Sequence, residues 1–271
     1  MEEIACAKIN LALHVRAREP DGYHRIETIF VFAEQGDRLR VADGDSLSLE
    51  VTGPFARDLA GEADNLVLRA AEALRTRCGI TTGAALTLDK QLPVAAGLGG
   101  GSADAAAALR LLDRWWGINA GEALLLEIAA ELGADIPACL LSRTCRGEGR
   151  GDRLEEVDGR RYSGIPLLIV NPGVPLPTGP VFAAWDGVDR GPLRDPFEGR
   201  NDLEAPAISL VPEIAQVLAL LAEAPGALLS RMSGSGASCF ALFESAAERD
   251  AAWARMAALH PRYWCLATRL K

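Results

Sequence analysis

A run of glycines leads directly into a helix-forming segment at residues 93–112, PVAAGLGGGSADAAAALRLL. The first turn of a helix leaves backbone N–H groups without partners and carries partial positive charge. Glycines ahead of it let the backbone curl so that more N–H groups converge, with no side chain blocking an anion. Gly97 to Gly101 therefore predict a phosphate cradle, in which Ser102 caps the helix or turns its hydroxyl to the ligand. The alternative is a mobile turn between a strand and a helix.

Two familiar nucleotide-binding patterns do not fit this loop. No Lys-Ser or Lys-Thr pair follows the glycines, so the loop is not the usual nucleotide-triphosphate P-loop. The spacing also departs from the G-x-G-x-x-G fingerprint of dinucleotide-binding folds. Asp104 at the start of the helix would repel phosphate, so we expect its carboxylate to face away or to meet a cation.

The elements around this loop can be read from hydrophobic spacing and turn residues. In the first half, Asp64 is expected to cap a helix over 65–78 that Gly79 ends, and Gly117 is expected to end the loop's own helix. The expected strands there are 3–15, 25–33, pieces of 37–51, and 84–89; the expected helices are 65–78, 102–116 and 122–132. In the second half we expect strands 165–170, 227–232, 237–243 and 262–269 and helices 212–224 and 246–259. The change to interleaved helices and strands favours two domains, 1–158 and 159–271.

Composition narrows the class of protein. The 271 residues are 49% hydrophobic and 24% charged, with a formal net charge of −9, which argues against a nucleic-acid partner. The start MEEIAC lacks the pattern of a secretory signal, and the apolar run 214–222 is too short to span a membrane. Six scattered cysteines without a C-x-x-C pair, and three histidines, argue against structural zinc and for reduced thiols. We expect a cytoplasmic protein with no membrane partner.

Five stretches taken together resemble the GHMP kinases. They are AKIN at 7–10, DGYH at 21–24, the glycine loop, LGADIP at 132–137 and MSGSGAS at 232–238. They follow one another in the family's order and span most of the chain. The resemblance implies an α+β, two-domain GHMP kinase fold. Its N-terminal domain would be similar to domain 2 of ribosomal protein S5, and its C-terminal domain would be ferredoxin-like.

The resemblance also implies a reaction and its catalytic pair. The γ-phosphoryl group of ATP, with Mg²⁺, would pass to the 2-hydroxyl of a cytidylated methylerythritol, a small-molecule substrate of non-mevalonate isoprenoid synthesis. Asp135 would orient the hydroxyl and accept its proton, and Lys8 would stabilise negative charge near the reacting centre. A carboxyl of pKa about 3.9 cannot ionise an alkanol beforehand, but it can take the proton late in bond breaking. The alternatives are a solvated strand lysine and an aspartate that caps a helix.

The binding residues implied by the resemblance form two groups. The ATP group consists of Asn65, Lys90, Pro93, Val94, Ala95, Ala96, Gly97, Leu98, Gly99, Gly100, Gly101, Ser102 and Ala103. The acceptor group consists of Asn10, Tyr23, His24, Thr178 and Phe182. Tyr23 and Phe182 would stack on the cytosine, and His24 would read its edge; plain core packing of the two aromatic rings is the alternative. Lys90 could equally be a solvated charge at a strand end.

Several features leave choices open. Val94 and Ala95 stand where this family more often has Met and Gly, and Ser235 replaces a commoner Thr. Gly101 stands where other members carry a magnesium-binding Ser, so the metal ligands stay unassigned. MSGSGAS is either a tight turn or a segment that packs on the phosphate loop. The chain could be a monomer or a homodimer. The rival functions are a GHMP enzyme with another acceptor, and an RNA-binding module or catalytically silent sensor on the same scaffold.

Overall fold

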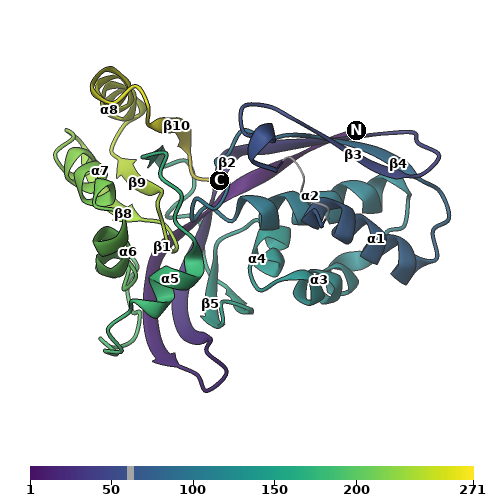
Figure 1. The fold of residues 1–271 in the computed structure, drawn as a ribbon, viewed down its shortest axis with the longest axis horizontal. Coiled ribbons are helices and arrows are strands. Elements are labelled where there is room, and N and C mark those ends of the chain that lie inside the picture. Colours follow the sequence, from purple (N-terminus) through teal and green to yellow (C-terminus); the bar gives the residue numbers. More distant parts are fainter. Residues whose placement is uncertain (60–63) are drawn as a thin grey trace. The chain divides into compact units, whose positions relative to one another are not determined.

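The computed structural model describes residues 1–59 and 64–271, which form two compact units built from interleaved segments (Figure 1). The first unit consists of residues 1–7, 35–94 and 99–142. The second unit consists of residues 8–34, 95–98 and 143–271. The strands β1 (Glu2–Arg18) and β2 (His24–Ala42) contribute residues to both units. None of the described helices is both long enough and apolar enough to cross a membrane.

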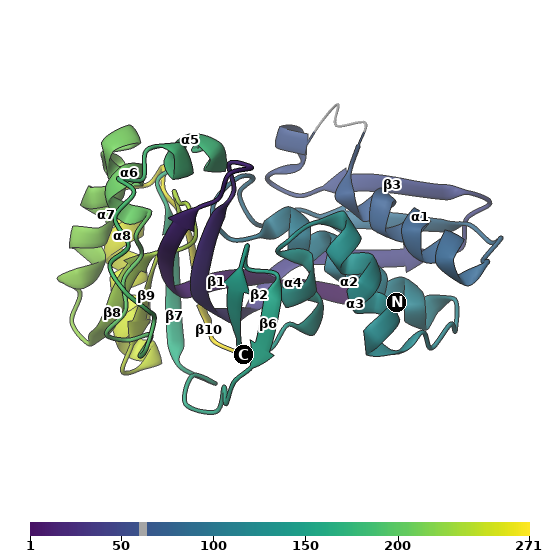
Figure 2. The same cartoon turned by 90° about the horizontal axis from the view of Figure 1, so that it is seen from below.

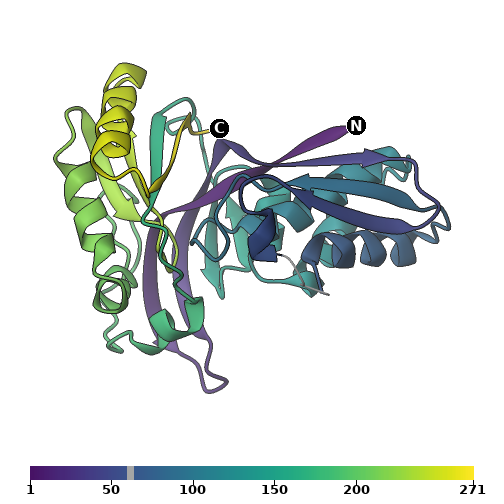
Figure 3. The ribbon, with the colours of Figure 1, turned by 45° about the horizontal axis from the view of Figure 1, so that its top comes forward.

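The first unit contains a small sheet with helices on one side (Figures 1 and 3). Strand β3 (Leu47–Thr52) runs parallel to β4 (Ala84–Asp89), and β4 pairs antiparallel with residues 38–42 of β2. Alternate residues of β4 are buried, as expected for a strand with one covered face. The remaining elements of this unit are η1 (Ala56–Leu59), α1 (Leu66–Cys78), α2 (Gly100–Trp115), α3 (Gly121–Leu132) and α4 (Ile136–Leu141).

Helix α1 is capped by a different residue from the one expected. Asn65 has the extended backbone of an N-cap, and its side-chain oxygen accepts a hydrogen bond from the Val67 N–H at 2.9 Å. The expectation that Asp64 caps this helix is therefore wrong, because its carboxylate lies instead 3.6 Å from a guanidinium nitrogen of Arg69. Gly79 ends the helix in the left-handed conformation, as predicted.

Helix α2 begins earlier than its sequence indicated. The N-cap position belongs to Gly99, whose φ of 61° is left-handed, and no side-chain cap is made there. Gly100 is the first helical residue, so Ser102 already lies inside the first turn and the expectation that it caps the helix is wrong. The alanines that follow are buried on nearly all sides, which lets neighbouring helices approach closely.

The second unit contains a four-stranded antiparallel sheet in the order β10-β7-β9-β8 (Figure 2). Its strands are β7 (Pro166–Asn171), β8 (Ala227–Met232), β9 (Cys239–Phe243) and β10 (Trp264–Arg269). Helices α7 (Glu213–Ala222) and α8 (Ala246–Leu259) pack on this sheet after its first and third strands, which is the ferredoxin-like arrangement predicted. The α+β expectation is likewise confirmed.

Four shorter elements of the second unit had not been expected. Strand β5 (Cys145–Gly149) pairs with residues 26–30 of β2 and forms a hairpin with β6 (Arg153–Glu156). Helices α5 (Thr178–Ala183) and α6 (Glu204–Leu210) lie in the connection between β7 and α7. All four are short, and the hairpin segment is rich in glycine and charge, so neither hydrophobic periodicity nor length marks them.

Candidate active site

Lys8 and Asn10 lie two residues apart on β1, so their side chains share one face of the strand. Both are buried, and the Lys8 Nζ donates a hydrogen bond to the Asn10 Oδ1 at 2.9 Å. The Asn10 Nδ2 donates to the Thr28 hydroxyl at 2.9 Å, and that hydroxyl donates to the Ala12 carbonyl at 2.6 Å. Nζ also lies 4.8 Å from the centre of the Phe30 ring. The ammonium group therefore has a fixed position, which excludes the alternative of a solvated strand lysine.

Asp135 belongs to the first unit and occupies the N-cap position of α4. Its backbone is helical (φ −84°, ψ −17°), and its side chain makes no capping hydrogen bond to this helix. The Asp135 carbonyl accepts the Cys139 N–H at 3.1 Å, as the first helical bond requires. This observation excludes the alternative that the Asp135 carboxylate caps helix α4.

Left-handed backbone recurs at every second residue of the glycine loop. The φ angles are 52° at Ala95, 74° at Gly97 and 61° at Gly99. An anion-binding nest needs left-handed residues in alternation with right-handed ones, and these three positions supply the left-handed residues. Ala95 adopts such an angle although it has a Cβ atom, whereas a glycine would adopt it without strain.

The segment MSGSGAS packs against residues 96–97 within the second unit. The Ser233 hydroxyl donates to the Gly97 carbonyl at 3.0 Å and accepts the Asn10 N–H at 3.2 Å. The Ser238 N–H donates to the Ala96 carbonyl at 3.1 Å. A Cβ atom on Gly97 would lie 2.3 Å from the Ser233 carbonyl oxygen, so only glycine fits this approach. One serine thus connects the strand that carries Lys8 to the glycine loop.

Lys90 is held by two carboxylates of the first unit. Its Nζ lies 2.5 Å from the Asp37 Oδ2 and 2.7 Å from the Asp104 Oδ2, with all three side chains buried. Asp104 therefore meets a cation, as its position in the helix required. Burial raises the pKa of the Asp104 carboxyl to about 8 despite the opposing effect of Lys90. Burial opposes the charge on Lys90, but the two carboxylates outweigh it and raise the pKa of the amine.

The residues expected to hold the acceptor's base make three ring contacts in the second unit. The centre of the His24 ring lies 5.0 Å from that of Phe182 and 5.7 Å from that of Trp185, which it meets edge-on. Burial lowers the pKa of the His24 imidazole. Tyr23 is 56% exposed, so core packing is excluded for this ring. The guanidinium carbon of Arg150 lies 3.8 Å from the centre of the Tyr23 ring.

Thr178 is the remaining residue of the expected acceptor group. Its hydroxyl lies 2.9 Å from the Ser235 hydroxyl of the glycine motif. Helix α5, which carries both Thr178 and Phe182, is thereby tied to the segment that contacts the glycine loop.

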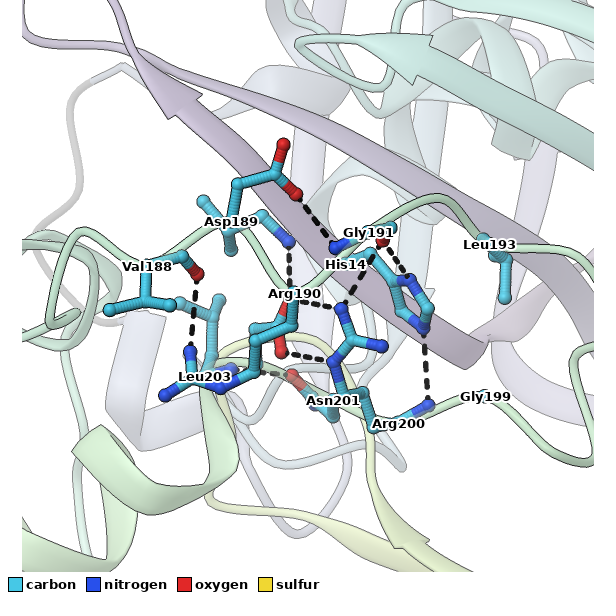
Figure 4. Close-up of polar contacts among 12 residues, drawn as sticks. His14, Val188, Asp189, Arg190, Gly191, Leu193, Gly199, Arg200, Asn201 and Leu203 are labelled. Carbon is cyan, nitrogen blue, oxygen red and sulfur yellow. Dashed lines mark hydrogen bonds and ion pairs between the residues drawn. The ribbon is translucent and has the colours of Figure 1, made fainter.

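The side chain of His14, on β1, forms hydrogen bonds with the backbone of the segment that follows α5 (Figure 4). The His14 Nε2 accepts the Arg200 N–H at 3.3 Å, so Nδ1 carries the proton that it donates to the Gly191 carbonyl at 3.0 Å. Burial lowers the pKa of this imidazole, which favours the neutral form that both bonds need. One residue further along, the Asn201 Nδ2 donates to the carbonyls of Met232 and Gly234 at 2.8 Å each.

Some of these residues could not be found from the sequence. Asp37 belongs to no recognisable motif, and its partner Lys90 lies 53 residues away in the sequence. Asn201 and Trp185 likewise lie outside every quoted motif. Ser233 lies inside MSGSGAS, but the sequence alone left open whether this segment packs on the phosphate loop. Among the described residues, no group of three or more His, Cys, Asp or Glu side chains is arranged to hold a metal ion.

Two parts of the chain match the two domains of one protein family. Residues 65–143 match the GHMP kinases N terminal domain, and residues 190–262 match the GHMP kinases C terminal domain.

Curated relatives and a solved structure share nearly the whole chain. A protein of Rhizorhabdus wittichii named 4-diphosphocytidyl-2-C-methyl-D-erythritol kinase is 59% identical, with 99% of this chain and 94% of the relative covered. A protein of the same name from Sphingopyxis alaskensis is 52% identical over 100% of this chain and 99% of its own. The crystal structure of a 4-(cytidine 5′-diphospho)-2C-methyl-D-erythritol kinase superposes with a TM-score of 0.83 at 34% identity, covering 100% of this chain and 99% of the other.

A more distant structure shares the fold alone. A homoserine kinase from Cytophaga hutchinsonii superposes with a TM-score of 0.72 at 19% identity, covering 100% of this chain and 96% of the other.

Proposed function

The chain belongs to the GHMP kinase family, and on that premise we propose that it transfers the γ-phosphoryl group of ATP to the 2-hydroxyl of 4-diphosphocytidyl-2-C-methyl-D-erythritol. The observation that carries the proposal is the 59% identity, over nearly all of both chains, to a protein named for this kinase activity. The reaction belongs to the non-mevalonate synthesis of isoprenoid precursors.

Two residues are assigned to the chemistry. Asp135 orients the acceptor hydroxyl and takes its proton as the new oxygen–phosphorus bond forms, when the hydroxyl has become acidic. Lys8 offsets the negative charge that develops on the transferred group. The proposal for Lys8 is supported by its hydrogen bond to Asn10, because a preoriented ammonium does not have to reorganise during the reaction.

The nucleotide is assigned to the glycine loop and the start of α2. Backbone N–H groups of residues 93–103 would bind the phosphates, and Asn65 would lie on the adenosine side. The left-handed residues of the loop support this assignment, since they are what a nest of N–H donors requires. Lys90 belonged to the same expectation, but its amine is occupied by Asp37 and Asp104.

The acceptor is assigned to the second unit. Tyr23 and Phe182 would stack on the cytosine, with His24 at its edge, and base stacking is worth about 1–3 kcal/mol per ring. Asn10 and Thr178 would contact the methylerythritol end. The exposure of Tyr23 supports the assignment, because the ring is not packed into the core.

Magnesium and cellular location are finer parts of the proposal. The described side chains offer no three-ligand metal cluster, so we expect Mg²⁺ to enter with ATP and to be held mainly by phosphate oxygens and water. Six free cysteines agree with a reducing compartment, which supports a cytoplasmic enzyme. We expect it to act as a monomer or a homodimer, with no nucleic-acid or membrane partner.

A coupled assay of ADP release tests the function. The acceptors are 4-diphosphocytidyl-2-C-methyl-D-erythritol, homoserine and mevalonate, each tested with ATP and Mg²⁺. We expect turnover with the cytidylated acceptor alone. Turnover only with a small acceptor would assign the chain to another GHMP reaction, and no turnover with ordinary ATP binding would identify a sensor.

The catalytic assignment is tested with Asp135→Asn in the same assay. Loss of the base should lower kcat by about 10²- to 10⁴-fold while ATP affinity and the folded state are kept. A variant with near-normal turnover would refute the role of Asp135.

A further inference from the structure

Three buried charged side chains meet at the start of α2. Asp37 comes from β2, Lys90 follows β4 directly, and Asp104 lies in the second turn of the helix. Their exposed fractions are 0%, 2% and 2%. The Lys90 Nζ bridges the two carboxylates at 2.5 and 2.7 Å. The cluster therefore joins three segments that are distant in the sequence, all within the first unit.

The same cluster also holds the main chain in front of the glycine loop. The Asp37 Oδ1 accepts the N–H groups of Gln91 at 2.6 Å and Leu92 at 2.8 Å, immediately before Pro93. On the other side of the loop, a Cβ atom added to Gly100 would lie 3.0 Å from the Lys90 Nζ. The ammonium group thus packs against the first residue of the helix. Residues 90–92 and the first two turns of α2 are fixed to one centre.

We propose that Asp37, Lys90 and Asp104 form a positioning brace that fixes both ends of the glycine loop and thereby sets the affinity for ATP, without Lys90 touching the nucleotide. The inference rests on the proposed ATP site. A lysine that binds phosphate presents its ammonium group to the ligand, whereas this ammonium is buried and donates to two carboxylates.

Stability alone does not account for such a cluster. Taking charges out of water is costly, and well-packed apolar side chains of similar volume are often at least as stabilising. What a buried network adds is a single geometry for the segments that it joins.

Calorimetric titration of ATP into the full-length protein tests the brace. The variants are Lys90→Met, Asp104→Asn and the double variant, and Asp104→Asn keeps the shape of the side chain. Each single variant should bind ATP about three- to tenfold more weakly. The double variant should bind ATP no more weakly than whichever single variant binds it less tightly, because both substitutions break the same brace. With saturating ATP, kcat should stay at the wild-type value while the KM for ATP rises.

Arg77→Met is the matched control. Arg77 also bridges two carboxylates, Glu127 at 2.9 Å and Glu131 at 2.8 Å, and it lies in the first unit. It joins α1 to α3 at the surface, and both of its carboxylate partners belong to α3. Its removal should leave ATP affinity unchanged.

The outcomes separate this inference from the proposed function. If Asp104→Asn binds ATP as tightly as the wild type or more tightly, while Lys90→Met binds weakly, Lys90 is a direct ligand and the brace is refuted. Lower thermal stability with unchanged ATP affinity in both single variants would also overturn it. A Lys90→Met variant that fails to fold leaves Asp104→Asn to decide. A wild-type protein that binds no ATP would overturn the proposed function and this inference together.

Discussion

Gly97→Ala measures how much the contact between the glycine loop and MSGSGAS matters. The left-handed φ of 74° costs an alanine about 1–2 kcal/mol, of which about 0.4–1 kcal/mol is regained because the unfolded chain is stiffer. The new Cβ atom would lie 2.3 Å from the Ser233 carbonyl oxygen and 2.8 Å from that of Gly236, and both are main-chain atoms. Relieving such overpacking costs typically about 1–3 kcal/mol more. We therefore expect Gly97→Ala to lower the free energy of unfolding by about 1–5 kcal/mol.

Gly79→Ala is the matched control for the backbone effect. Its φ of 66° is similar, but an added Cβ would have no neighbour within 4 Å. We expect a loss of only about 1 kcal/mol and normal kinetics. Urea unfolding followed by circular dichroism gives both free energies, and the ADP-release assay gives the KM for ATP. Because relief of the clash must move the loop, Gly97→Ala should raise this KM at least about tenfold. Two variants of equal stability and equal KM would refute the close approach at Gly97.

Three further predictions concern a helix cap, the acceptor and a titration. Asn65→Ala should lower the free energy of unfolding by about 1 kcal/mol through the lost N-cap, whereas Asp64→Ala should change it by less than about 0.5 kcal/mol; equal losses in urea unfolding would contradict this. Tyr23→Ala should raise the KM for the cytidylated acceptor about 5- to 150-fold and leave the KM for ATP unchanged; an unchanged acceptor KM would favour a structural role. Asp104 holds its proton to a pKa of about 8 in the folded state, while the unfolded carboxyl ionises near its ordinary value of about 3.9. Between these pH values the unfolded state binds fewer protons, so the free energy of unfolding should fall as pH rises. Unfolding at about pH 6 and about pH 8 should show that Asp104→Asn lessens this fall, and identical pH dependences would count against it.

Hydrophobic spacing and turn residues predicted the helices and strands well where these features lie within or directly beside the element. Strands β4 and β8 and helix α8 have the expected bounds, and Gly79 ends α1 as expected. The cap of α1 differed because Asp64 and Asn65 are both good N-cap residues, and only the backbone conformation distinguishes them. Helix α5 was missed because six residues flanked and interrupted by Pro and Gly show no helical period.

The candidate site was predictable to the extent that its parts lie close together in sequence. Strand alternation places Lys8 and Asn10 on one face, and AKIN shows both residues. Their partners could not be inferred, because Thr28 and Ser233 lie 18 and 223 residues from Asn10. Lys90 lies just before the loop in sequence, but nothing in its neighbourhood indicates that Asp37 accepts its hydrogen bond. Such pairings arise only when the sheet has formed.

The domain division at residue 158 stays a prediction. A shift in composition marks a point along the chain, whereas the two compact units consist of three segments each. Strands β1 and β2 run for 17 and 19 residues, and each is divided between the units. The predicted boundary therefore names one position, whereas the compact units are defined by sets of segments.

Because each unit is assembled from several segments of the chain, dividing the gene at one position would separate segments that pack together. A fragment consisting of residues 159–271 would lack the Leu11 carbonyl that Arg231 binds, and it would lose both main-chain bonds that Leu13 makes to the 200–202 segment. It would also lack the bridge between Ala33 and Leu270. Separate expression of the two halves should therefore yield insoluble pieces, and co-expressed halves should recover the enzyme only by complementing each other. Surface turns such as the one at residues 117–121 are better places for tags or new termini than any point between the predicted domains.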